Sequence, residues 1–385
     1  MQPFSGIRVL DLTHVLAGPY CSYQLGLLGA EIIKIEAPCS PDITRQRGKS
    51  DDWNAARLGL TFQAQASNKK SLVLDLKHAD GADLFRQLLN SADVLVENYR
   101  PGKLESLGFG YNQVREYVPE IIYCSLSGFG QSGPRSGVGA YDNVIQASSG
   151  IMDRSGGVKT AASFIDYSTG LAAAFAISSA LYRRLRDNTG VYIDCSMLDV
   201  ALTMQGAEIC SELSGDQTYS ERHEPGLGDY ATANGQIMLG AFTFGQHRKF
   251  WNYFGNREFS DMQKWPEIWS AAPRMRKYLE QILLTKTAEN WIRIFHSIDV
   301  PAERIETLSE TLENPQLEHR RILQDVIHDD GRKVTVPAAA FEFSHDGPAA
   351  VSPPPRFGAH SKEILQEMGK TSTQIEDLLN RGVIA

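Results

Sequence analysis

The chain lacks the patterns that mark metal sites, disulfide frameworks and membrane anchors. Its five cysteines form no CxxC pair and no cysteine–histidine spacing, which argues against zinc or disulfides. No apolar run reaches the roughly eighteen residues of a membrane span, because Arg183, Arg184 and Arg186 close the longest one. The N-terminus enters a strand pattern directly and shows no signal peptide. We therefore expect a cytoplasmic protein with reduced thiols, no metal site and no membrane segment.

Two further absences narrow the class of protein. A formal net charge of −8 over 385 residues argues against a general nucleic-acid-binding protein. The first strand–helix turn lacks GxGxxG, so binding of an NAD-type dinucleotide is disfavoured. The hydrophobic content of 42% is ordinary for a globular chain, and this length predicts two domains or one elaborated α/β domain.

Strand and helix patterns alternate over roughly the first 200 residues, which predicts a mostly parallel, doubly wound α/β sheet. The expected strands lie at 6–12, 30–38, 70–77, 92–99 and 120–130. The composition becomes polar and turn-rich near 212, and aromatic helix patterns follow from Tyr230. A strand-like alternation returns at 332–343. These changes predict a second, smaller unit in the later part of the chain.

One acid stands just ahead of an apolar, alanine-rich stretch. Residues 171–186 predict a buried helix of about four turns, with Ser168 or Thr169 as its N-cap and 188–190 as its end. Asp166 precedes this cap, where the helix dipole favours negative charge. We therefore expect its carboxyl group to be ionised near neutral pH. The local sequence leaves open whether Asp166 is a reactive acid or only a capping or loop acid.

Eight segments follow one another over nearly the full chain in an order that is typical of one family. They are LDLTHVLAGPY, LGAEIIKIEAP, NKKSLVLDLK, ADVLVENYRPGKLESLGFGY, SLSGFGQSGP, AYDNVIQASSG, IDYSTGL and PPPRFGAHSKEIL, with GVI at the end. Together they resemble the class III CoA-transferases, the family of formyl-CoA and carnitine CoA-transferases. The resemblance implies an enzyme that moves CoA from an acyl-CoA donor to a free carboxylic acid. It implies coenzyme A as a substrate, and no metal or redox cofactor.

The resemblance also implies an architecture. Each subunit of an interlocked homodimer would form a ring through which its partner passes. A large doubly wound domain would be built from both ends of the chain, with a smaller domain inserted between them. Combined with the composition changes, this predicts residues 1–211 as the first part of a large CoA-binding α/β domain. Residues 212–331 would form a linker and a small α+β domain, and residues 332–385 would return to complete the large domain.

The resemblance assigns the nucleophile to Asp166, which would form a mixed anhydride with the acyl group and then an aspartyl-CoA thioester. Tyr141 and Asp142 match the family's active-site tyrosine–acid pair. A tyrosine hydroxyl can donate to a developing oxyanion, although Tyr141 could equally be a core residue. The intermediates need shielding from water. Gly226 and Gly228, in HEPGLGD, match a glycine-bearing lid or else belong to an ordinary turn.

CoA needs apolar slots for its adenine and pantetheine groups and cations for its phosphates. The residues that match the family's CoA-contacting turns, or lie near them as cations, are Val15, Ala17, Asn98, Tyr99, Arg100, Lys103 and Arg135. The last two could equally be solvated surface charges. Ala37 and Ser106 stand where some relatives carry phosphate-binding arginines, so Arg45 or Arg47 could take that role. Leu16 stands where oxalate-using members carry glutamine, which disfavours oxalate as a substrate.

Two other functions stay open at this stage. The α-methylacyl-CoA racemases share this fold and CoA site but use a histidine base in a GHDINY-like motif. Here the segment reads GAYDNV with Tyr141 in the histidine's place, which disfavours racemisation. A CoA-binding protein without transferase activity is disfavoured because Asp166 and Gly170 are both present.

The acid substrates themselves are not fixed by the sequence. Arg45, Arg47 and Arg222 could orient the second carboxylate of a dicarboxylic substrate, such as the acyl group of succinyl-CoA. His14 lies in the same turn as Val15, where a single histidine is more often structural or exposed.

Overall fold

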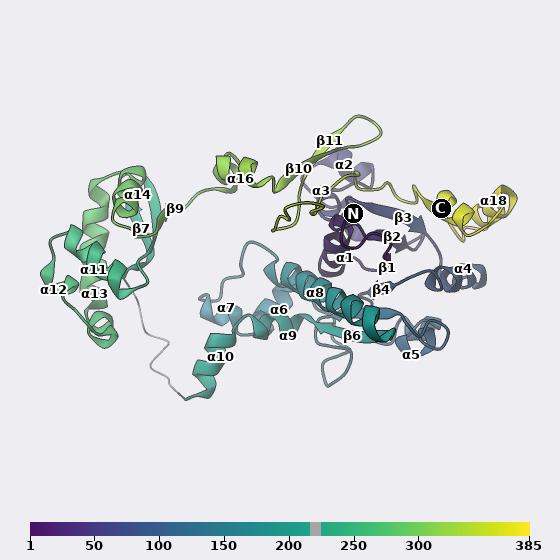
Figure 1. The fold of residues 1–385 in the computed structure, drawn as a ribbon, viewed down its shortest axis with the longest axis horizontal. Helices are drawn as coiled ribbons and strands as arrows, with labels where there is room; N and C mark the ends of the chain where they lie inside the picture. The colour runs from purple at the N-terminus through teal and green to yellow at the C-terminus, as the bar shows by residue number, and fades with distance from the viewer. Residues whose placement is uncertain (216–224) are drawn as a thin grey trace. The chain divides into compact units, whose positions relative to one another are not determined.

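The computed structural model describes residues 1–215 and 225–385. The chain forms two compact units (Figure 1). Unit 1 comprises Met1–Gly206 and Glu318–Ala385, so it is built from both ends of the chain, and unit 2 comprises Ala207–Leu317. The second boundary falls earlier than the expected 331, because β10 (Leu323–Ile327) and β11 (Lys333–Pro337) pair as an antiparallel hairpin. A boundary at 331 would cut this hairpin between its two strands.

A six-stranded parallel sheet forms the centre of unit 1. Its strands are β1 (Arg8–Asp11), β2 (Glu31–Glu36), β3 (Lys69–Val73), β4 (Val94–Glu97), β5 (Ile122–Ser127) and β6 (Val191–Ser196). Their order is β3-β2-β1-β4-β5-β6, and each neighbouring pair is parallel. The predicted doubly wound α/β fold is confirmed. The chain reverses its direction of winding between β1 and β4, which is where such sheets bind ligands.

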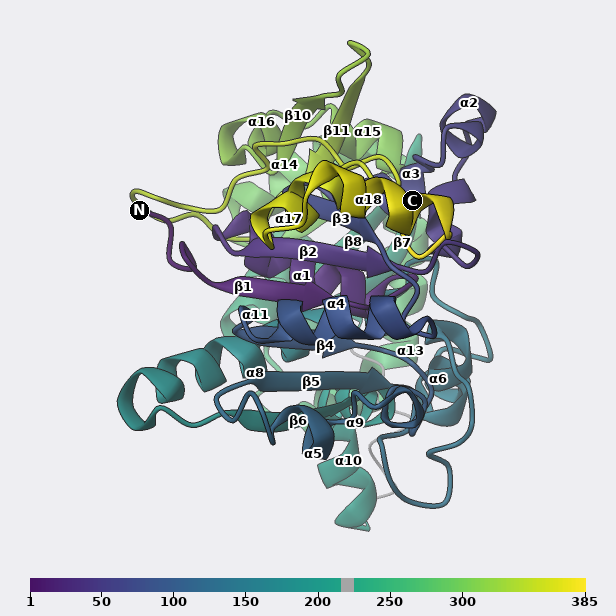
Figure 2. The same ribbon diagram turned by 90° about the vertical axis from the view of Figure 1, so that its right-hand side faces the viewer.

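Apolar layers cover both faces of this sheet. On one face, α1 (Ala17–Leu27) and α8 (Phe164–Asp187) pack on strand residues such as Val9 and Ile122. The other face is covered by α4 (Ala79–Leu89), α5 (Tyr111–Val114), α17 (Ser361–Glu367) and α18 (Ser372–Asn380). Figure 2 shows the sheet with α4, α17 and α18 in front of it. The C-terminal segment therefore completes the core begun by the N-terminal segment.

Helix α8 is longer than the sequence predicts. It has 24 residues and begins at Phe164, so Asp166 lies in its first turn rather than ahead of its cap. Asn188 ends it in a left-handed conformation with φ 54°, within the expected range. By length and composition α8 could span a membrane, contrary to our expectation. Yet 50% of its apolar window is buried inside the protein, against α1 and the sheet, as in a core helix.

Shorter elements complete unit 1. They are η1 (Ile43–Gln46), α2 (Asp51–Ala55), α3 (Leu60–Gln63), η2 (Glu105–Leu107), α6 (Asp142–Ser148), α7 (Ile151–Arg154) and α9 (Met197–Thr203). Two helices span the unit boundaries, α10 (Gly206–Leu213) and α16 (Pro315–Arg320).

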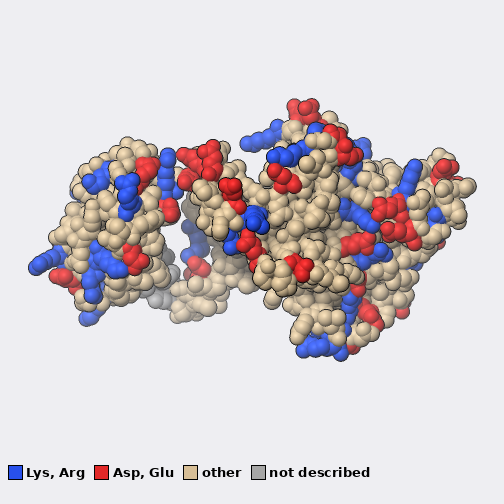
Figure 3. Space-filling model, turned by 45° about the horizontal axis from the view of Figure 1, so that its top comes forward, with Lys and Arg blue, Asp and Glu red and all other residues tan. Residues whose placement is uncertain are grey.

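Unit 2 is a small α+β unit with an aromatic core. Its antiparallel strands are β7 (Leu227–Thr232), β8 (Gly235–Gly240) and β9 (Ala302–Arg304). Its helices are α11 (Phe244–Tyr253), α12 (Arg257–Ser260), α13 (Trp265–Ile282), η4 (Leu283–Thr285), α14 (Ala288–Ser297) and α15 (Leu308–Leu312). Trp251 and Trp291 are fully buried among them. Both units carry basic and acidic side chains on the face shown in Figure 3.

Candidate active site

A cavity of about 460 Å³ opens in unit 1 where β1, β4 and β5 end. Residues that follow these strands form most of its wall, which is the position expected for a ligand at the switch point of the sheet. The wall contains His14, Val15, Leu16, Ala17, Asn98, Tyr99, Arg100, Pro101, Leu126, Ser127, Gly128, Ser136, Val138, Gly139, Ala140, Tyr141, Asp166 and Met197. Seven residues that the sequence analysis singled out for catalysis or CoA binding therefore line one cavity: Val15, Ala17, Asn98, Tyr99, Arg100, Tyr141 and Asp166.

Asp166 is the one carboxylate among the described residues that line this cavity. Its side chain is held in the first turn of α8 and is 9% exposed. Burial, and then the nearby charge of Asp142, raise the pKa of its carboxyl group to about 7. The carboxyl group is therefore only partly ionised at neutral pH, unlike the ionised state expected from the sequence, because the loss of solvation outweighs the favourable helix N-terminus.

Asp142 stands behind Asp166 rather than beside it in the cavity. Its Oδ2 accepts hydrogen bonds from the backbone N–H groups of Ile165 at 2.9 Å and of Asp166 at 3.3 Å. These two groups belong to the unsatisfied N–H set of the first helical turn, so Asp142 caps α8 from another helix. Tyr141 precedes it at the start of α6, is 64% exposed and lines the cavity, so it is not a core tyrosine.

The turn after β1 has an unusual backbone. Val15 has a φ of 74°, a left-handed conformation that is rare for a β-branched residue. Its N–H donates to Oδ1 of Asp42 at 3.2 Å, and its carbonyl accepts from Nε2 of Gln65 at 2.6 Å. Lys34 supports Asp42 at 3.3 Å, and both side chains are fully buried. The strained turn is therefore fixed by a buried charged network.

The turn after β4 is tied to the turn after β1. The Asn98 amide donates to the carbonyl of His14 at 2.8 Å and accepts from the N–H of His14 at 2.9 Å. The rings of His14 and Tyr99 meet edge to face at 6.0 Å. Burial and the charge of Lys34 lower the pKa of His14, which favours a neutral imidazole in the wall of the cavity.

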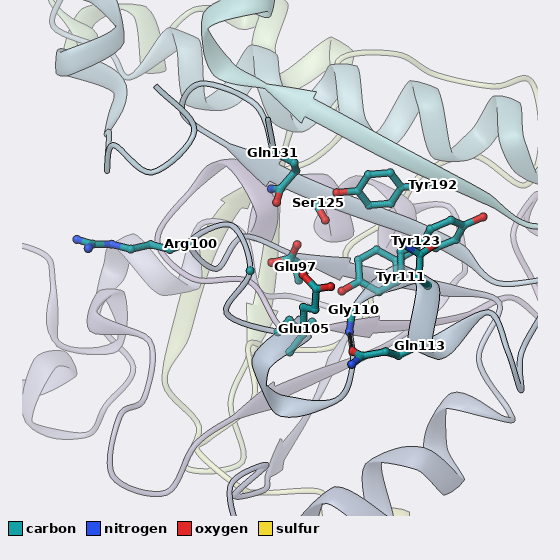
Figure 4. A pocket seen from close by; sticks show the side chains of 13 residues that line it. Glu97, Arg100, Glu105, Gly110, Tyr111, Gln113, Tyr123, Ser125, Gln131 and Tyr192 are labelled. Carbon is teal, nitrogen blue, oxygen red and sulfur yellow. Dashed lines mark hydrogen bonds between the residues drawn. The ribbon is translucent and has the colours of Figure 1, made fainter. Parts of the chain in front are cut away.

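A second cavity of about 370 Å³ lies on the α4 side of the sheet (Figure 4). The stacked rings of Tyr111 and Tyr192 form part of its wall, 5.1 Å apart. Burial raises the pKa of Glu97 there to about 7, and Glu97 Oε2 accepts from the N–H of Tyr99 at 2.8 Å. Arg100 lines both cavities, and in Figure 4 its side chain points away from Glu97. Glu97 thus anchors the turn that carries Asn98, Tyr99 and Arg100.

Apart from Arg100, the described cations that were considered for CoA binding lie outside the cavity wall. Arg45 is 0% exposed and ion-paired with Glu36 at 2.6 Å, so the expectation that it contacts a phosphate or substrate carboxylate is wrong. Arg47, Lys103 and Arg135 are exposed. The guanidinium of Arg135 lies 3.8 Å over the ring of Phe129. Arg222 lies outside the described residues.

The two lid glycines belong to unit 2. Gly228 lies in β7 and pairs with Leu239, and the carbonyl of Gly226 accepts from the N–H of Ala241. A Cβ at Gly226 would meet the Ala241 carbonyl oxygen at 2.8 Å, so this position needs glycine. Their assignment as a lid stays a prediction. Among the residues that the structure describes, no group of three or more His, Cys, Asp or Glu side chains could hold a metal ion.

The family model for CoA-transferase family III matches residues 4–361. The chain belongs to CoA-transferase family III. It is 33% identical to succinyl-CoA:glutarate CoA-transferase of Mus musculus over 400 residues, covering 100% of this chain and 91% of that protein. It is 30% identical to succinate–glutarate CoA-transferase of Agrobacterium fabrum, covering 95% and 96%. The predicted family and enzyme class are confirmed.

Solved structures show the same family fold. A CaiB/BaiF family protein from Brucella suis matches with a TM-score of 0.80 at 27% identity, covering 95% of this chain and 99% of the other. A protein from Mycobacterium tuberculosis matches with a TM-score of 0.82 at 26% identity, covering 94% and 99%.

Residues that the sequence did not single out as functional fix the cavity wall of this CoA-transferase from behind. Asp42, Gln65 and Lys34 hold the Val15 turn, and Gln146 contacts Asp142. Lys34 offered a signal, because a lysine within an apolar strand pattern must find a buried partner. The others lie in segments without a strong pattern, and only the folded chain brings them to the site.

Proposed function

We propose that this CoA-transferase uses Asp166 as a covalent nucleophile and passes CoA through an aspartyl-CoA thioester. The observation that carries the proposal is the position of Asp166 as the single carboxylate of the described cavity wall, at the switch point of the sheet. A pKa of about 7 suits the role, because an appreciable fraction is ionised at neutral pH and the anion is poorly solvated.

The exchange proceeds by steps that balance without a further reactant. A carboxylate oxygen of Asp166 attacks the thioester carbonyl carbon, the C–S bond breaks, and CoA thiolate leaves a mixed anhydride. The thiolate then attacks the Asp166 carbonyl carbon and releases the donor acid as its carboxylate. This gives the aspartyl-CoA thioester. The acceptor carboxylate attacks that thioester in turn, and the same two steps in reverse form the new acyl-CoA and regenerate Asp166.

The surrounding residues bind and orient CoA in this proposal. The turn that contains Val15 and Ala17 contacts the pantetheine chain. Asn98 holds this turn next to Tyr99 and Arg100. Arg100 supplies a cation in the cavity wall. Tyr141 lines the cavity and is exposed, and in this proposal its hydroxyl donates to a developing oxyanion.

We also propose that the acids exchanged are short dicarboxylates, with succinyl-CoA as donor. The names of relatives at 30–33% identity over nearly the whole chain support a succinyl donor and a glutarate-like acceptor. Leu16 in the cavity wall supports the same choice, since its apolar side chain offers no hydrogen bond to the compact dianion oxalate. Arg100 is the cation of the described wall that could pair with a second carboxylate.

The working unit that we propose is the interlocked homodimer. An apolar row on the outer face of α8 supports it. These side chains are Tyr167, Leu171, Phe175, Tyr182 and Leu185, with exposed fractions from 37% to 84%. Their spacing of three, four or seven residues places them on one side of the helix. A row of this kind marks a protein interface.

The test pairs acetyl-CoA or succinyl-CoA with a panel of mono- and dicarboxylic acids and follows acyl-CoA products by mass spectrometry. Succinyl-CoA with glutarate or another short dicarboxylate should give the fastest exchange. Asp166→Asn should abolish exchange while CoA binding by calorimetry stays within about threefold of wild type. Monocarboxylates outperforming every dicarboxylate would reject the substrate proposal. Deuterium exchange at the α-carbon of a 2-methylacyl-CoA, without transfer, would instead indicate racemase chemistry.

A further inference from the structure

Gln146 lies directly behind the Asp142–Asp166 contact. It sits on α6 and is 0% exposed. Its Nε2 donates to Oδ1 of Asp142, and its Oε1 accepts from the N–H of Thr160 at 3.1 Å. The other carboxylate oxygen of Asp142 accepts from Ile165 and Asp166. One buried amide thus joins the segment that enters α8 to the carboxylate that caps it.

The chemistry of this position requires an amide. Both ends of the Gln146 side chain are used, one as donor and one as acceptor, and an ionised glutamate could supply only the acceptor. A methionine of similar size could supply neither. Because the site is buried, water cannot replace the lost partner, so a carboxylate oxygen of Asp142 would be left unpaired.

We propose that Gln146 is a positioning residue for the transfer reaction: it fixes the Asp142 carboxylate, and through it the first turn of α8 and the orientation of Asp166. The proposal rests on the proposed role of Asp166 as nucleophile. Gln146 does not line the described cavity wall and touches no reacting atom, so its effect passes through Asp142.

The hydrogen bond between Gln146 and Asp142 also fixes the position of the negative charge next to Asp166. The ionisable groups that line the cavity with Asp166 are His14, Tyr99, Arg100 and Tyr141, and Tyr167 follows it on α8. The pKa of His14 is lowered, so its imidazole carries little charge at neutral pH. Burial, and then the charge of Asp142, raise the pKa of Asp166. Releasing Asp142 should therefore ease ionisation of Asp166 while spoiling its orientation.

Gln146→Met, Gln146→Glu and the matched control Gln205→Met test this inference. The Gln205 amide bonds the carbonyls of Ser149 and Ala201 and has no bond to Asp142. We expect Gln146→Met to lower kcat roughly 10- to 100-fold, as a small misplacement of a reacting group does, with the KM for acyl-CoA within about threefold. The acidic limb of its kcat/KM profile should move to lower pH. Gln205→Met should leave kcat and the acidic limb unchanged.

Gln146→Glu keeps the size of the side chain and the acceptor for Thr160, so it tests the donor alone if the methionine variant fails to fold. It should lower kcat at least as much at high pH, where a second carboxylate faces Asp142, and less at low pH, where the protonated acid can donate to Asp142. The inference is overturned if either folded variant keeps the wild-type kcat and an unmoved acidic limb. It is also overturned if the loss of kcat equals that of Gln205→Met. Failure of the proposed function would be seen separately, as full activity of Asp166→Asn.

Discussion

At the scale of single residues, Asp166 shows two opposing effects on one carboxyl group. Its place in the first turn of α8 favours the anion by roughly 0.3–1 kcal/mol. Burial and the charge of Asp142 favour the acid, and the pKa of about 7 corresponds to roughly 4 kcal/mol against ionisation. Burial therefore decides the outcome. The ionised carboxylate is poorly stabilised by its surroundings, which favours its attack on a thioester.

The rate of transfer should depend on pH through this group. Only the ionised Asp166 can attack, so kcat/KM should fall as the pH drops below about 7, the pKa to which burial raises it. Initial rates of acyl-CoA formation between pH 5.5 and 9 would show this fall as the acidic limb of the pH–rate profile. A rate that stays flat down to pH 5.5 would contradict the assignment.

Removing the charge should stabilise the fold while it destroys activity. In the unfolded chain Asp166 ionises near pH 4, and in the native state its pKa is about 7, so native stability falls as the pH rises through this interval. Asp166→Asn does not lose this stability, because asparagine does not ionise. Its gain in unfolding free energy over wild type should grow between pH 5 and pH 8.5, to roughly 2–4 kcal/mol. Denaturant titrations at both pH values measure it, and a gain independent of pH would exclude this cause.

The sequence placed Asp166, Val15 and Asn98 in one site because their motifs match a family in order and spacing. It could not foresee that Asp166 is buried or that Val15 is strained, since burial and backbone conformation depend on distant segments. Gln65 and Asp42 reach the Val15 turn only after the chain has folded.

At the scale of elements, the contact of α1 with α8 positions Asp166. A Cβ at Gly170 would lie 2.6 Å from the carbonyl oxygen of Ala17 and 3.1 Å from the backbone N of Cys21. Glycine therefore lets α1 lie directly on α8, one turn after Asp166. The sequence predicted α8, but it started this helix too late because Ser168 and Thr169 are good capping residues inside the actual helix.

Gly170→Ala should push these helices apart. We expect a loss of roughly 1–3 kcal/mol of stability, as for other overpacked contacts, together with reduced transfer. Gly206→Ala is the matched control, because it lies in α10 with no atom within 4 Å of an added Cβ. The control should be neutral or slightly stabilising. Equal thermal midpoints for the two variants would show that the close approach is unimportant.

At the scale of the whole molecule, unit 1 is closed by segments from opposite ends of the chain. Ile364 and Leu365 of α17 share a core with Leu84 and Phe85 of α4. Family resemblance predicted this return, and the strand-like alternation at 332–343 agreed with it. The alternation expected at 332–343 contains β11, whereas its short and largely exposed partner β10 was not predicted.

The exposed row on α8 should be covered in the proposed homodimer. Phe175→Asp, at a side chain that is 76% exposed, should shift the protein toward monomer in sedimentation velocity experiments. Val351→Asp is the control, since Val351 is equally exposed at 77% and belongs to a segment whose N–H bonds Asn68 rather than to α8. Unchanged sedimentation of Phe175→Asp would remove the row from the interface.

The most direct measurement traps the covalent intermediate. The protein is mixed with succinyl-CoA, treated with hydroxylamine, digested, and its peptides are analysed by mass spectrometry. We predict a hydroxamate at Asp166 in the wild-type protein and its absence from Asp166→Asn. Transfer that proceeds while Asp166 stays unmodified, or a hydroxamate at another carboxyl group, would contradict covalent catalysis by Asp166.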